Sequence, residues 1–436
     1  MSLNGSVTFE KYKLNNGLDV ILHIDRTLPI VAVNLWYHVG SAREVPGKSG
    51  FAHLFEHMMF QGSHNAGAGL HFKLIEDAGG TLNGSTTTDR TNYWATVPKN
   101  YLAHILWLES DRMGWLLPAM TQKKLDTQID VVKNERRQNY DNRPYGLAFE
   151  ILSKHLYPED HPYSWTTIGS MEDIGNASLE DVQSFFRQYY GPNNASLCIG
   201  GDIEVEETKK LIEKYFGDIP SGPPVGKLEP RIPTINKAQH VVHEDNVQLP
   251  RVYTAWHTSH LFGKDDAEVD LVVDALAKGK NSRLYRSLVY EKQIAQDVSF
   301  FHISREIGSL AIVVATARPD HSLTKIQEAI DQEIGAFIEN GLTDREYDRI
   351  RNAQKSSFTY SLQNIGGFFG VTDRLNEYNV FLEDPGFINE DLNRYLSVDK
   401  ESIRAAAETY LQPEKRVVLS IVPKGKQELA VQTNSL

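Results

Sequence analysis

The chemistry of this 436-residue sequence centres on residues 50–60, GFAHLFEHMMF, which hold two histidines and a glutamate. The segment predicts a helix, and at about 100° per residue His53, Glu56 and His57 share one face of it. Two imidazoles one turn apart can bind one zinc ion, and a neighbouring carboxylate can take a proton from zinc-bound water. The order H-x-x-E-H is the inverted form of a zinc-peptidase motif.

The alternative for this segment is a surface helix with two histidines and a carboxylate. Its apolar neighbours disfavour that alternative: Phe51, Leu54, Phe55, Met58, Met59 and Phe60. Ionisable groups in such surroundings need a partner, and a cation bound between them provides one. The segment therefore predicts a metal site.

A catalytic zinc site usually has a third protein ligand and leaves one position for water. Glu135 lies near the apolar stripe of a helix predicted at residues 122–138, and Glu109 lies within the stripe of the preceding helix. Both glutamates are therefore expected to point inward. Helical phase does not decide between them, and either could instead be a structural carboxylate paired with an arginine such as Arg112 or Arg136.

Composition and charge restrict the possible functions. The net charge of −12 argues against nucleic-acid binding, because phosphate backbones are bound by basic surfaces. No apolar run approaches the roughly 20 residues of a membrane span. The one cysteine, Cys198, lies in an apolar run, so an internal disulfide framework and a cysteine-based metal cluster are excluded. We expect a soluble globular protein.

Two homologous domains are predicted. The Pro/Gly-rich stretch at residues 220–233, PSGPPVGKLEPRIP, divides the chain near its middle and predicts a linker. Matching features recur at a nearly constant offset along the chain: Trp36 and Trp256, Pro98 and Pro319, Pro192 and Pro413. We predict a catalytic domain over residues 1–218, a linker over 219–240 and a homologous domain over 241–436.

Each domain is predicted to be α+β, an α/β sandwich with helices packed on a mixed or antiparallel sheet. Strands are predicted in the first half at residues 7–14, 18–23, 30–39, 91–97 and 195–200. Helices are predicted at residues 122–138, 178–190, 323–340 and 399–411, among others.

The second copy lacks the residues of the metal motif. At the offset that both proline pairs share, its corresponding positions are Asp274, Ala277 and Lys278. These three side chains cannot repeat the histidine–glutamate–histidine chemistry. We therefore expect one active and one inactive domain.

Several motifs resemble the pitrilysin family of inverted zinc peptidases, which includes mitochondrial processing peptidase and insulin-degrading enzyme. They are HLFEHMMFQGS, AGGTLNGSTTTDRTNYWATVP, LESDRM, VVKNERRQNYDNRPYG, YYGPNNASLCIGGDI and NSRLYRSLVYEKQIA. The resemblance covers both halves of the chain. It implies a catalytic subunit similar to bacterial processing peptidases, which cleaves unfolded peptides or oligopeptides inside a chamber built from four homologous domains.

This resemblance also implies roles for individual residues. It makes Glu135 the third ligand of one Zn²⁺ per chain, beside the two histidines, and makes Glu56 the general base. Glu109 becomes a carboxylate behind the ligands. Many relatives have Glu where this chain has Gln128, whose amide can form a hydrogen bond but carries no charge.

Asn83 matches a family position that contacts the substrate near the scissile bond. Its alternative role is that of a turn residue before Gly84. The peptide is expected to extend along the strand after Asn83 and to add main-chain hydrogen bonds to a sheet edge.

The resemblance further implies a partner. Relatives that act alone carry an Arg and a Tyr seven residues apart in the second half, which bind the substrate carbonyl and stabilise the oxyanion. The matching positions here are Val289 and Gln296, and neither side chain can do this. Arg286 and Tyr290 are out of register and are predicted to lie on a helix surface. We expect a homologous inactive subunit to supply the Arg–Tyr pair, in a heterodimer or as the second half of a longer native chain.

Two alternatives to a peptidase are disfavoured by the sequence. One is a non-catalytic structural or assembly subunit of a larger complex, which the intact motif argues against. The other is a structural zinc site, which usually has four protein ligands, and no fourth is found. Residues 1–6 do not resemble a signal peptide. We expect a soluble bacterial protein, periplasmic if a signal peptide has been removed and otherwise cytoplasmic.

Overall fold

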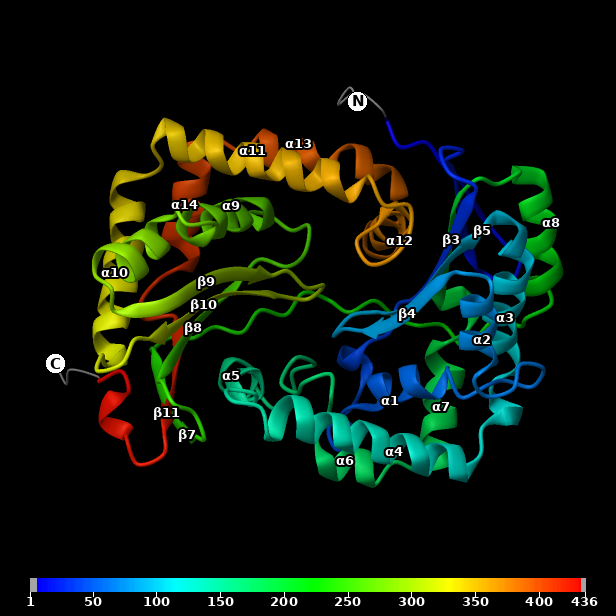
Figure 1. The fold of residues 1–436 in the computed structure, drawn as a ribbon, viewed down its shortest axis with the longest axis horizontal. Coiled ribbons are helices and arrows are strands. Elements are labelled where there is room, and N and C mark those ends of the chain that lie inside the picture. Colours follow the sequence, from blue (N-terminus) through cyan, green and yellow to red (C-terminus); the bar gives the residue numbers. More distant parts are fainter. Residues whose placement is uncertain (1–5, 433–436) are drawn as a thin grey trace. The chain divides into compact units, whose positions relative to one another are not determined.

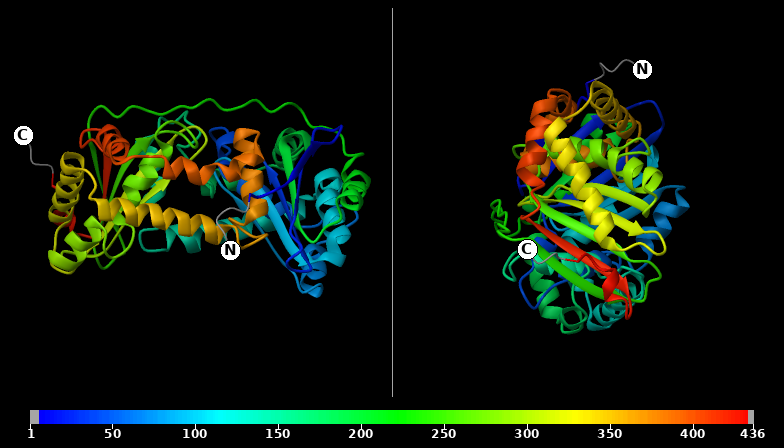
Figure 2. Two further views of the ribbon diagram at one scale, coloured as in Figure 1. Left: turned by 90° about the horizontal axis from the view of Figure 1, so that it is seen from above. Right: turned by 90° about the vertical axis from the view of Figure 1, so that its left-hand side faces the viewer.

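The computed structural model describes residues 6–432 and divides into two compact units (Figure 1). Unit 1 is formed by Met1–Arg136, Trp165–Lys227 and Ser356–Leu392. Unit 2 is formed by Arg137–Ser164, Leu228–Lys355 and Asn393–Leu436. Each unit contains one β-sheet with helices packed on it, and Figure 2 shows both from two further directions.

Unit 1 contains a six-stranded sheet in the order β1-β2-β6-β3-β5-β4. The β2–β6 pair is parallel and the other pairs are antiparallel. The strands are β1 (Glu10–Lys13), β2 (Asp19–Ile24), β3 (Ile30–Tyr37), β4 (Thr81–Thr86), β5 (Thr91–Pro98) and β6 (Ala195–Gly201). Among residues 6–432, strand β4 therefore forms an edge of the sheet, with a strand neighbour on one side only.

The helices of unit 1 lie on both faces of this sheet. In Figure 1, α2, α3 and α8 lie on one side of the strands and α12 lies on the other. The helices are α1 (Phe51–Met58), α2 (Leu70–Asp77), α3 (Leu102–Trp115), α4 (Gln122–Arg136), α6 (Met171–Gly175), α7 (Leu179–Tyr189), α8 (Val205–Phe216) and α12 (Val371–Leu382). Helix α7 begins where the Ser178 hydroxyl accepts a hydrogen bond from the Asp181 amide, a typical N-cap.

Unit 2 repeats this architecture. Its sheet has the order β7-β11-β8-β10-β9, with β7 and β11 parallel. The strands are β7 (Gln239–Asp245), β8 (Arg251–Thr258), β9 (Ala295–Ile303), β10 (Ser309–Ala317) and β11 (Arg416–Pro423). The helices are α5 (Ala148–Leu156), α9 (Asp266–Ala277), α10 (Leu323–Asn340) and α14 (Lys400–Tyr410), and α11 (Asp344–Ser361) and α13 (Asp391–Leu396) contain points where the chain changes unit. Residues 137–141 and 285–291 form π-helical turns.

The matching strand order of the two sheets agrees with the predicted fold of two similar α+β domains. One detail of the predicted repeat was wrong. The seventh residue of β3 is Trp36 and the seventh residue of β8 is His257, so Trp36 does not correspond to Trp256. The Trp36 indole donates a hydrogen bond to Asp373 of α12, whereas Trp256 belongs to the core that contains α9. The two tryptophans therefore face opposite sides of their sheets, because neighbouring strand residues alternate.

Each unit contains a helix from the other half of the sequence. In unit 1, α12 is held by Asp373, whose carboxylate accepts hydrogen bonds from Asn34, Trp36 and Asn92 of β3 and β5 at 2.8–3.1 Å. In unit 2, α5 packs against β8 and β11. The domain boundaries expected from the sequence, at residues 218 and 241, place α5 in the first domain and α12 in the second. The compact units instead include α5 in unit 2 and α12 in unit 1.

The predicted helices agree closely with the observed ones, and α10 begins and ends at the expected residues. The five predicted strands of the first half correspond to β1, β2, β3, β5 and β6. Strand β4 was not among them, because TLNGST is polar and contains a glycine. No helix among residues 6–432 is both long and apolar enough to cross a membrane.

Candidate active site

Helix α1 carries the H-x-x-E-H motif and begins at a fixed point. Gly50 precedes it with φ of 89°, a left-handed conformation that favours glycine. The Glu44 carboxylate accepts hydrogen bonds from the amides of Gly50 (3.0 Å) and Ala52 (2.8 Å), which would otherwise be unsatisfied at the helix start. Burial raises the pKa of Glu44 to about 8, against the effect of these two hydrogen bonds. The start of the metal motif is therefore held by a buried acid.

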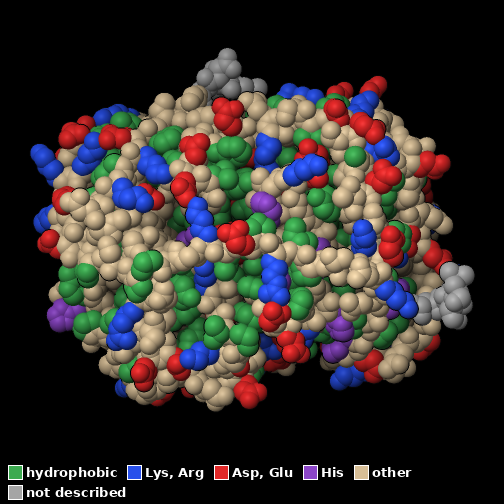
Figure 3. All heavy atoms as spheres, turned by 180° about the vertical axis from the view of Figure 1, so that it is seen from behind, with side chains coloured by type: hydrophobic (Ala, Val, Ile, Leu, Met, Phe, Trp, Pro, Cys, Tyr) green, Lys and Arg blue, Asp and Glu red, His purple; other side chains and the backbone are tan. Residues whose placement is uncertain are grey.

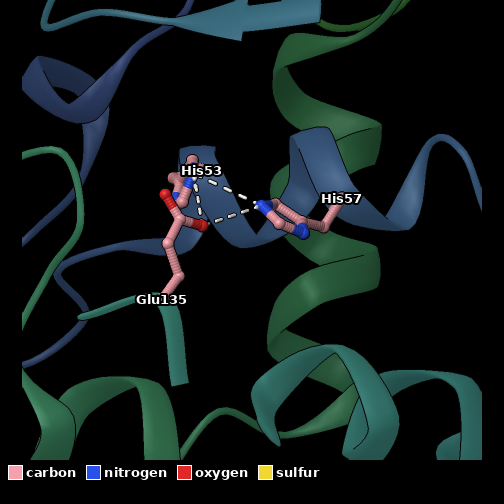
Figure 4. Close-up of side chains that lie close together, drawn as sticks. All are labelled: His53, His57 and Glu135. Atoms are coloured by element: carbon pink, nitrogen blue, oxygen red, sulfur yellow. Dashed lines mark hydrogen bonds and ion pairs between the residues drawn. The ribbon is translucent and has the colours of Figure 1, made fainter. Parts of the chain in front are cut away.

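Three candidate ligands converge from α1 and α4 (Figure 4). The Nε2 atoms of His53 and His57 are 3.3 Å apart. The Glu135 Oε2 atom lies 3.5 Å from His57 Nε2 and 3.7 Å from His53 Nε2. Helical phase had left Glu109 of α3 and Glu135 of α4 as alternative third ligands, and the structure brings Glu135 to the histidines.

These distances fit a zinc ion. With bonds of about 2.0–2.1 Å, the ligand atoms of a tetrahedral site are separated by about 3.3–3.4 Å, close to the spacings here. Burial, followed by the neighbouring His57, lowers the pKa of His53, which keeps this imidazole neutral and able to bind a metal. Among the described His, Cys, Asp and Glu side chains, none joins the group as a fourth member. Three protein ligands are typical of a catalytic site.

Glu56 lies on the same helix but outside the ligand group. Its Oε2 atom accepts a hydrogen bond of 2.6 Å from the Thr86 hydroxyl on β4. Burial raises the pKa of Glu56, and the effects of Thr86, His57 and Arg90 oppose the increase. A partly buried carboxylate beside the ligands is a suitable proton acceptor.

Glu109 is held away from the ligand group. It forms a buried ion pair with Arg112 of the same helix, in which Arg112 Nε donates to Glu109 Oε2 at 2.8 Å. The guanidinium also lies 3.9 Å from the centre of the Tyr93 ring. The structure thus realises the paired-carboxylate alternative for Glu109, and a contact with the ligands stays an untested expectation.

The other two candidates, Gln128 and Asn83, lie on α4 and β4. Gln128 is buried on α4. Asn83 is exposed on β4, and its side-chain oxygen accepts a hydrogen bond of 2.8 Å from the Gly84 amide. This local bond resembles a turn interaction, but it is formed within an edge strand.

Two residues of the site were missed from the sequence. Thr86 orients the candidate base, and Glu44 fixes the start of α1. Thr86 lies in the run STTTDRT of a quoted motif, where three adjacent threonines gave no reason to select one. The position of Glu44, six residues before Gly50, was the available signal for a helix cap.

In unit 2, the positions that correspond to the motif form an ordinary ion pair. Lys278 Nζ lies 2.7 Å from Asp274 Oδ2, and Gln354 donates to the same oxygen at 3.0 Å. Ala277 takes the position of the base. The carboxylate, amide and ammonium groups replace the ligand set.

The positions expected to lack the Arg–Tyr pair are also in unit 2. Val289 is buried and Gln296 is exposed on β9. Arg286 pairs with Glu291 at 2.6 Å, and Tyr290 is 75% exposed. Arg286 and Tyr290 therefore lie on the surface of unit 2, as predicted.

Charges of both signs are interspersed on the face shown in Figure 3. This distribution agrees with the scattered Lys and Arg residues of the sequence and with its net charge of −12. A nucleic-acid site would need a basic patch or stripe.

Two family models match the chain. Residues 19–165 match "Insulinase (Peptidase family M16)", and residues 176–354 match "Peptidase M16 inactive domain". All candidate site residues lie in the first match, and Asp274 lies in the second. The two matches therefore divide the chain as the motif does.

Named relatives and solved structures agree with these models. The zinc protease PqqE of Helicobacter pylori is 31% identical over 83% of this chain and 82% of the relative. The crystal structure of a protease from Helicobacter pylori has a TM-score of 0.89 at 27% identity, covering 96% of this chain and all of that one. The periplasmic protease PqqL of Escherichia coli has a TM-score of 0.80 at 16% identity, and the match covers all of this chain and 50% of PqqL. The chain belongs to the insulinase family of zinc proteases, peptidase family M16.

Proposed function

We propose that this chain is a zinc-dependent endopeptidase in which His53, His57 and Glu135 bind one Zn²⁺ and Glu56 is the general base. The observation that carries this proposal is the spacing of 3.3–3.7 Å among the three ligand atoms, with a partly buried carboxylate beside them. The names of the relatives support zinc and proteolysis for the family.

Zinc held by these ligands supplies a Lewis acid that polarises a carbonyl and lowers the pKa of water to about 7. Glu56 accepts a proton from the attacking water and then gives it to the leaving amine. The Thr86 hydroxyl holds one oxygen of Glu56, so the other oxygen is free to take the proton. Peptide hydrolysis by addition of water follows.

The substrate is an extended, unfolded peptide that pairs with strand β4. This strand is an edge of its sheet, and its main-chain groups on one side have no strand neighbour within the described residues. A peptide added there forms main-chain hydrogen bonds irrespective of its sequence. Asn83, exposed on the same strand, is the proposed side-chain contact near the scissile bond.

A partner completes the site. Val289 has no hydrogen-bond donor, and the neutral amide of Gln296 stands where relatives that act alone have Tyr, so the Arg–Tyr pair of those relatives is absent from this chain. The loss of one oxyanion donor typically reduces turnover by about 10²–10³-fold. The proposed partner is a homologous subunit without H-x-x-E-H, or a second half of a longer native chain.

The test combines metal analysis with cleavage of an unfolded peptide by the purified chain, alone and mixed with a homologous subunit that lacks H-x-x-E-H and carries the Arg–Tyr pair. We expect one zinc per chain and at least about a hundredfold faster cleavage in the mixture. Equal rates for the chain alone and the mixture would disprove the need for a partner. Bound zinc without cleavage in either sample would favour a structural or assembly subunit.

A further inference from the structure

We infer that Glu135 is positioned for zinc by residues that lie outside the ligand group. These are Arg136, which follows it in α4, and the glycines Gly50 and Gly169, whose backbones are in close contact. Together they set the distance between Glu135 and the two histidines, and with it the zinc affinity. The inference rests on the proposed zinc ligands and adds positioning residues to them.

Glu135 lies in the last turn of its helix. Helix α4 ends at Arg136, and residues 137–141 continue as a π-helical turn. Helix ends fray, because their last carbonyl groups lack partners within the helix. A binding site, however, needs its groups within about 0.5 Å of their correct positions. The third ligand therefore needs an anchor outside its own helix.

Arg136 provides this anchor. Its side chain is buried, and its Nη1 atom donates a hydrogen bond of 2.6 Å to the carbonyl oxygen of Gly169. Hydrogen bonds from a charged donor are roughly twice as strong as those between neutral groups. Gly169 belongs to the loop at residues 165–170, which leads into α6, and α6 packs against α4 (Figure 1). Arg136 thus fixes the end of α4 to this loop.

Gly169 in turn lies against the start of the metal helix. Both glycines have left-handed backbones, with φ of 89° at Gly50 and 73° at Gly169. A Cβ atom on Gly169 would lie 2.4 Å from the Ser49 carbonyl oxygen and 2.5 Å from Gly50 Cα. A Cβ atom on Gly50 would lie 2.8 Å from the Ile168 carbonyl oxygen. The two segments therefore pack so closely that neither glycine position has room for a side chain.

Hydrogen bonds hold these two segments together. The Asp173 carboxylate of α6 accepts hydrogen bonds from the Ser49 hydroxyl and, at 2.9 Å, from the Ser49 amide. The Ser49 hydroxyl also accepts a hydrogen bond of 3.0 Å from the Ser170 amide. The start of α1, the loop and the end of α4 are therefore connected to one another.

The size of the expected displacement shows why the glycine contact matters for zinc. Ordinary contacts between carbon and oxygen are about 3.3 Å long, so a methyl group on Gly169 would separate the loop from Ser49 by roughly 1 Å. Because Arg136 is bonded to Gly169, the end of α4 would move with the loop. A shift of this size exceeds the tolerance of about 0.5 Å for a binding site.

The repeat in the chain provides an internal comparison. The positions that correspond to Gly50, Arg136 and Gly169, at the offset of the repeat, hold other residues: Leu271, Ser357 and Glu390. Leu271 is the sixth residue of α9, so the helix of unit 2 continues through the position where α1 begins. The three positioning residues thus occur in the copy that has the metal motif and are not repeated in the other.

The test measures the zinc affinity of the full chain by competition with a chelator. Gly169→Ala and Arg136→Met are each expected to weaken zinc binding by at least about tenfold, the lower end of the range for partners behind metal ligands. Arg136→Lys keeps a charged donor and is expected to recover part of the loss. If Gly169→Ala does not fold, Arg136→Met decides, because it adds no steric conflict.

Gly79→Ala is the matched control for Gly169→Ala. Gly79 has φ of 72°, so alanine is strained there as it is at Gly169, but a Cβ atom at Gly79 meets nothing within 4 Å. Its zinc affinity should equal that of the parent. Denaturant unfolding of the zinc-free proteins measures the stability that each variant loses. A loss of zinc affinity in Gly79→Ala as large as that in Gly169→Ala would overturn the inference.

A double variant shows whether the effect of Arg136 depends on Glu135. Glu135→Ala leaves the two histidines as a weaker site, for which the position of α4 no longer matters. Addition of Arg136→Met to Glu135→Ala should then change the zinc affinity by less than about twofold. An effect of Arg136→Met that persists at full size without Glu135 contradicts the inference.

The results also separate this inference from the proposed function. Zinc affinities of Gly169→Ala and Arg136→Met that equal the affinity of the parent overturn the inference and leave the proposed peptidase intact. A parent chain that binds no zinc contradicts the proposed ligands and this inference together.

Discussion

Helices α1 and α9 occupy equivalent places in two similar domains and carry different chemistry. In α1, His53 and His57 are four residues apart and hold their Nε2 atoms 3.3 Å from each other. In α9, Asp274 and Lys278 have the same spacing and form a salt bridge of 2.7 Å. The same helical geometry therefore supports a metal site or an ion pair according to residue type alone.

Helices α3 and α10 also correspond to each other, and they differ in whether a buried position is charged or apolar. Helices α3 and α10 begin at Leu102 and Leu323, and the eighth residue of each is Glu109 and Ile330 respectively. The buried Glu109 of unit 1 thus corresponds to Ile330 in the apolar core of unit 2. Unit 1 has a buried ion pair where unit 2 has an aliphatic side chain.

The largest effect is expected from Glu56→Gln. An amide cannot accept the proton, so turnover should fall by roughly two to four orders of magnitude while zinc remains bound. The rate of peptide cleavage and the zinc content check this. Ala277→Gln, at the corresponding position of α9, is the matched control and should leave both unchanged. Near-normal turnover in the Glu56 variant would mean that another group is the base.

Removal of a proposed zinc ligand from α1 should weaken metal binding, whereas a substitution at the corresponding position of α9 should not. His57→Ala is expected to reduce zinc affinity by more than about a hundredfold, because even partners behind the ligands contribute about 10–100-fold. Lys278→Ala on α9 should retain one zinc per chain. Competition with a chelator measures the two affinities. Undiminished zinc in His57→Ala would place the ion elsewhere.

The buried ion pair provides a test of stability. Arg112→Met leaves the Glu109 carboxylate buried without its partner, which should lower the free energy of unfolding by about 3–5 kcal/mol. The double variant Glu109→Ile with Arg112→Met imitates the apolar core of unit 2 and should recover most of that loss. Denaturant unfolding of both variants and the parent measures the difference. If the double variant is no more stable than the single one, Glu109 has a further role at the site.

The smallest expected effect is a pH dependence of the free energy of unfolding, which arises where His257 contacts α5. His257 Nε2 lies 2.9 Å from the Leu156 carbonyl oxygen of α5, and burial lowers the pKa of His257 to about 4. A histidine in the unfolded chain titrates near 6.5, so the unfolded state binds the proton first as pH falls. The stability contributed above pH 6.5 should therefore be lost progressively between about pH 6.5 and 4.

The measurement is the free energy of unfolding at pH 7 and pH 5. The parent protein is expected to lose about 1–2 kcal/mol more than His257→Gln over this interval. Trp36, the equivalent residue of unit 1, does not titrate and introduces no such dependence. Equal losses in the parent and the variant would show that His257 is not the group responsible.

The sequence predicted much of this molecule because its signals were local. Apolar periodicity predicted α7, α10 and α14, and H-x-x-E-H predicted the face of α1. To choose Glu135 over Glu109, one must know which helix packs on α1. Helical phase along a single helix does not give that information. The family resemblance supplied that information.

The features that were missed depend on contacts between distant residues. The interaction between Thr86 and Glu56 joins a polar strand to a helix 30 residues earlier. The pairing of Trp36 with Trp256 failed because an identical residue type was preferred to a constant offset. The exchange of α5 and α12 leaves no local signal, since an amphipathic helix does not encode which sheet it will cover.

The exchanged helix α12 affects how the protein is made. Asn34 emerges early from the ribosome, yet its buried partner Asp373 follows 339 residues later. Until Asp373 is synthesised, the polar groups of β3 and β5 that bind its carboxylate lack this partner. The face of the sheet that α12 covers is also exposed. Unit 1 therefore cannot be completed while the first half of the chain is being synthesised, because α12 is produced only near the end of translation. For the proposed peptidase, this order would delay activity until synthesis is almost complete.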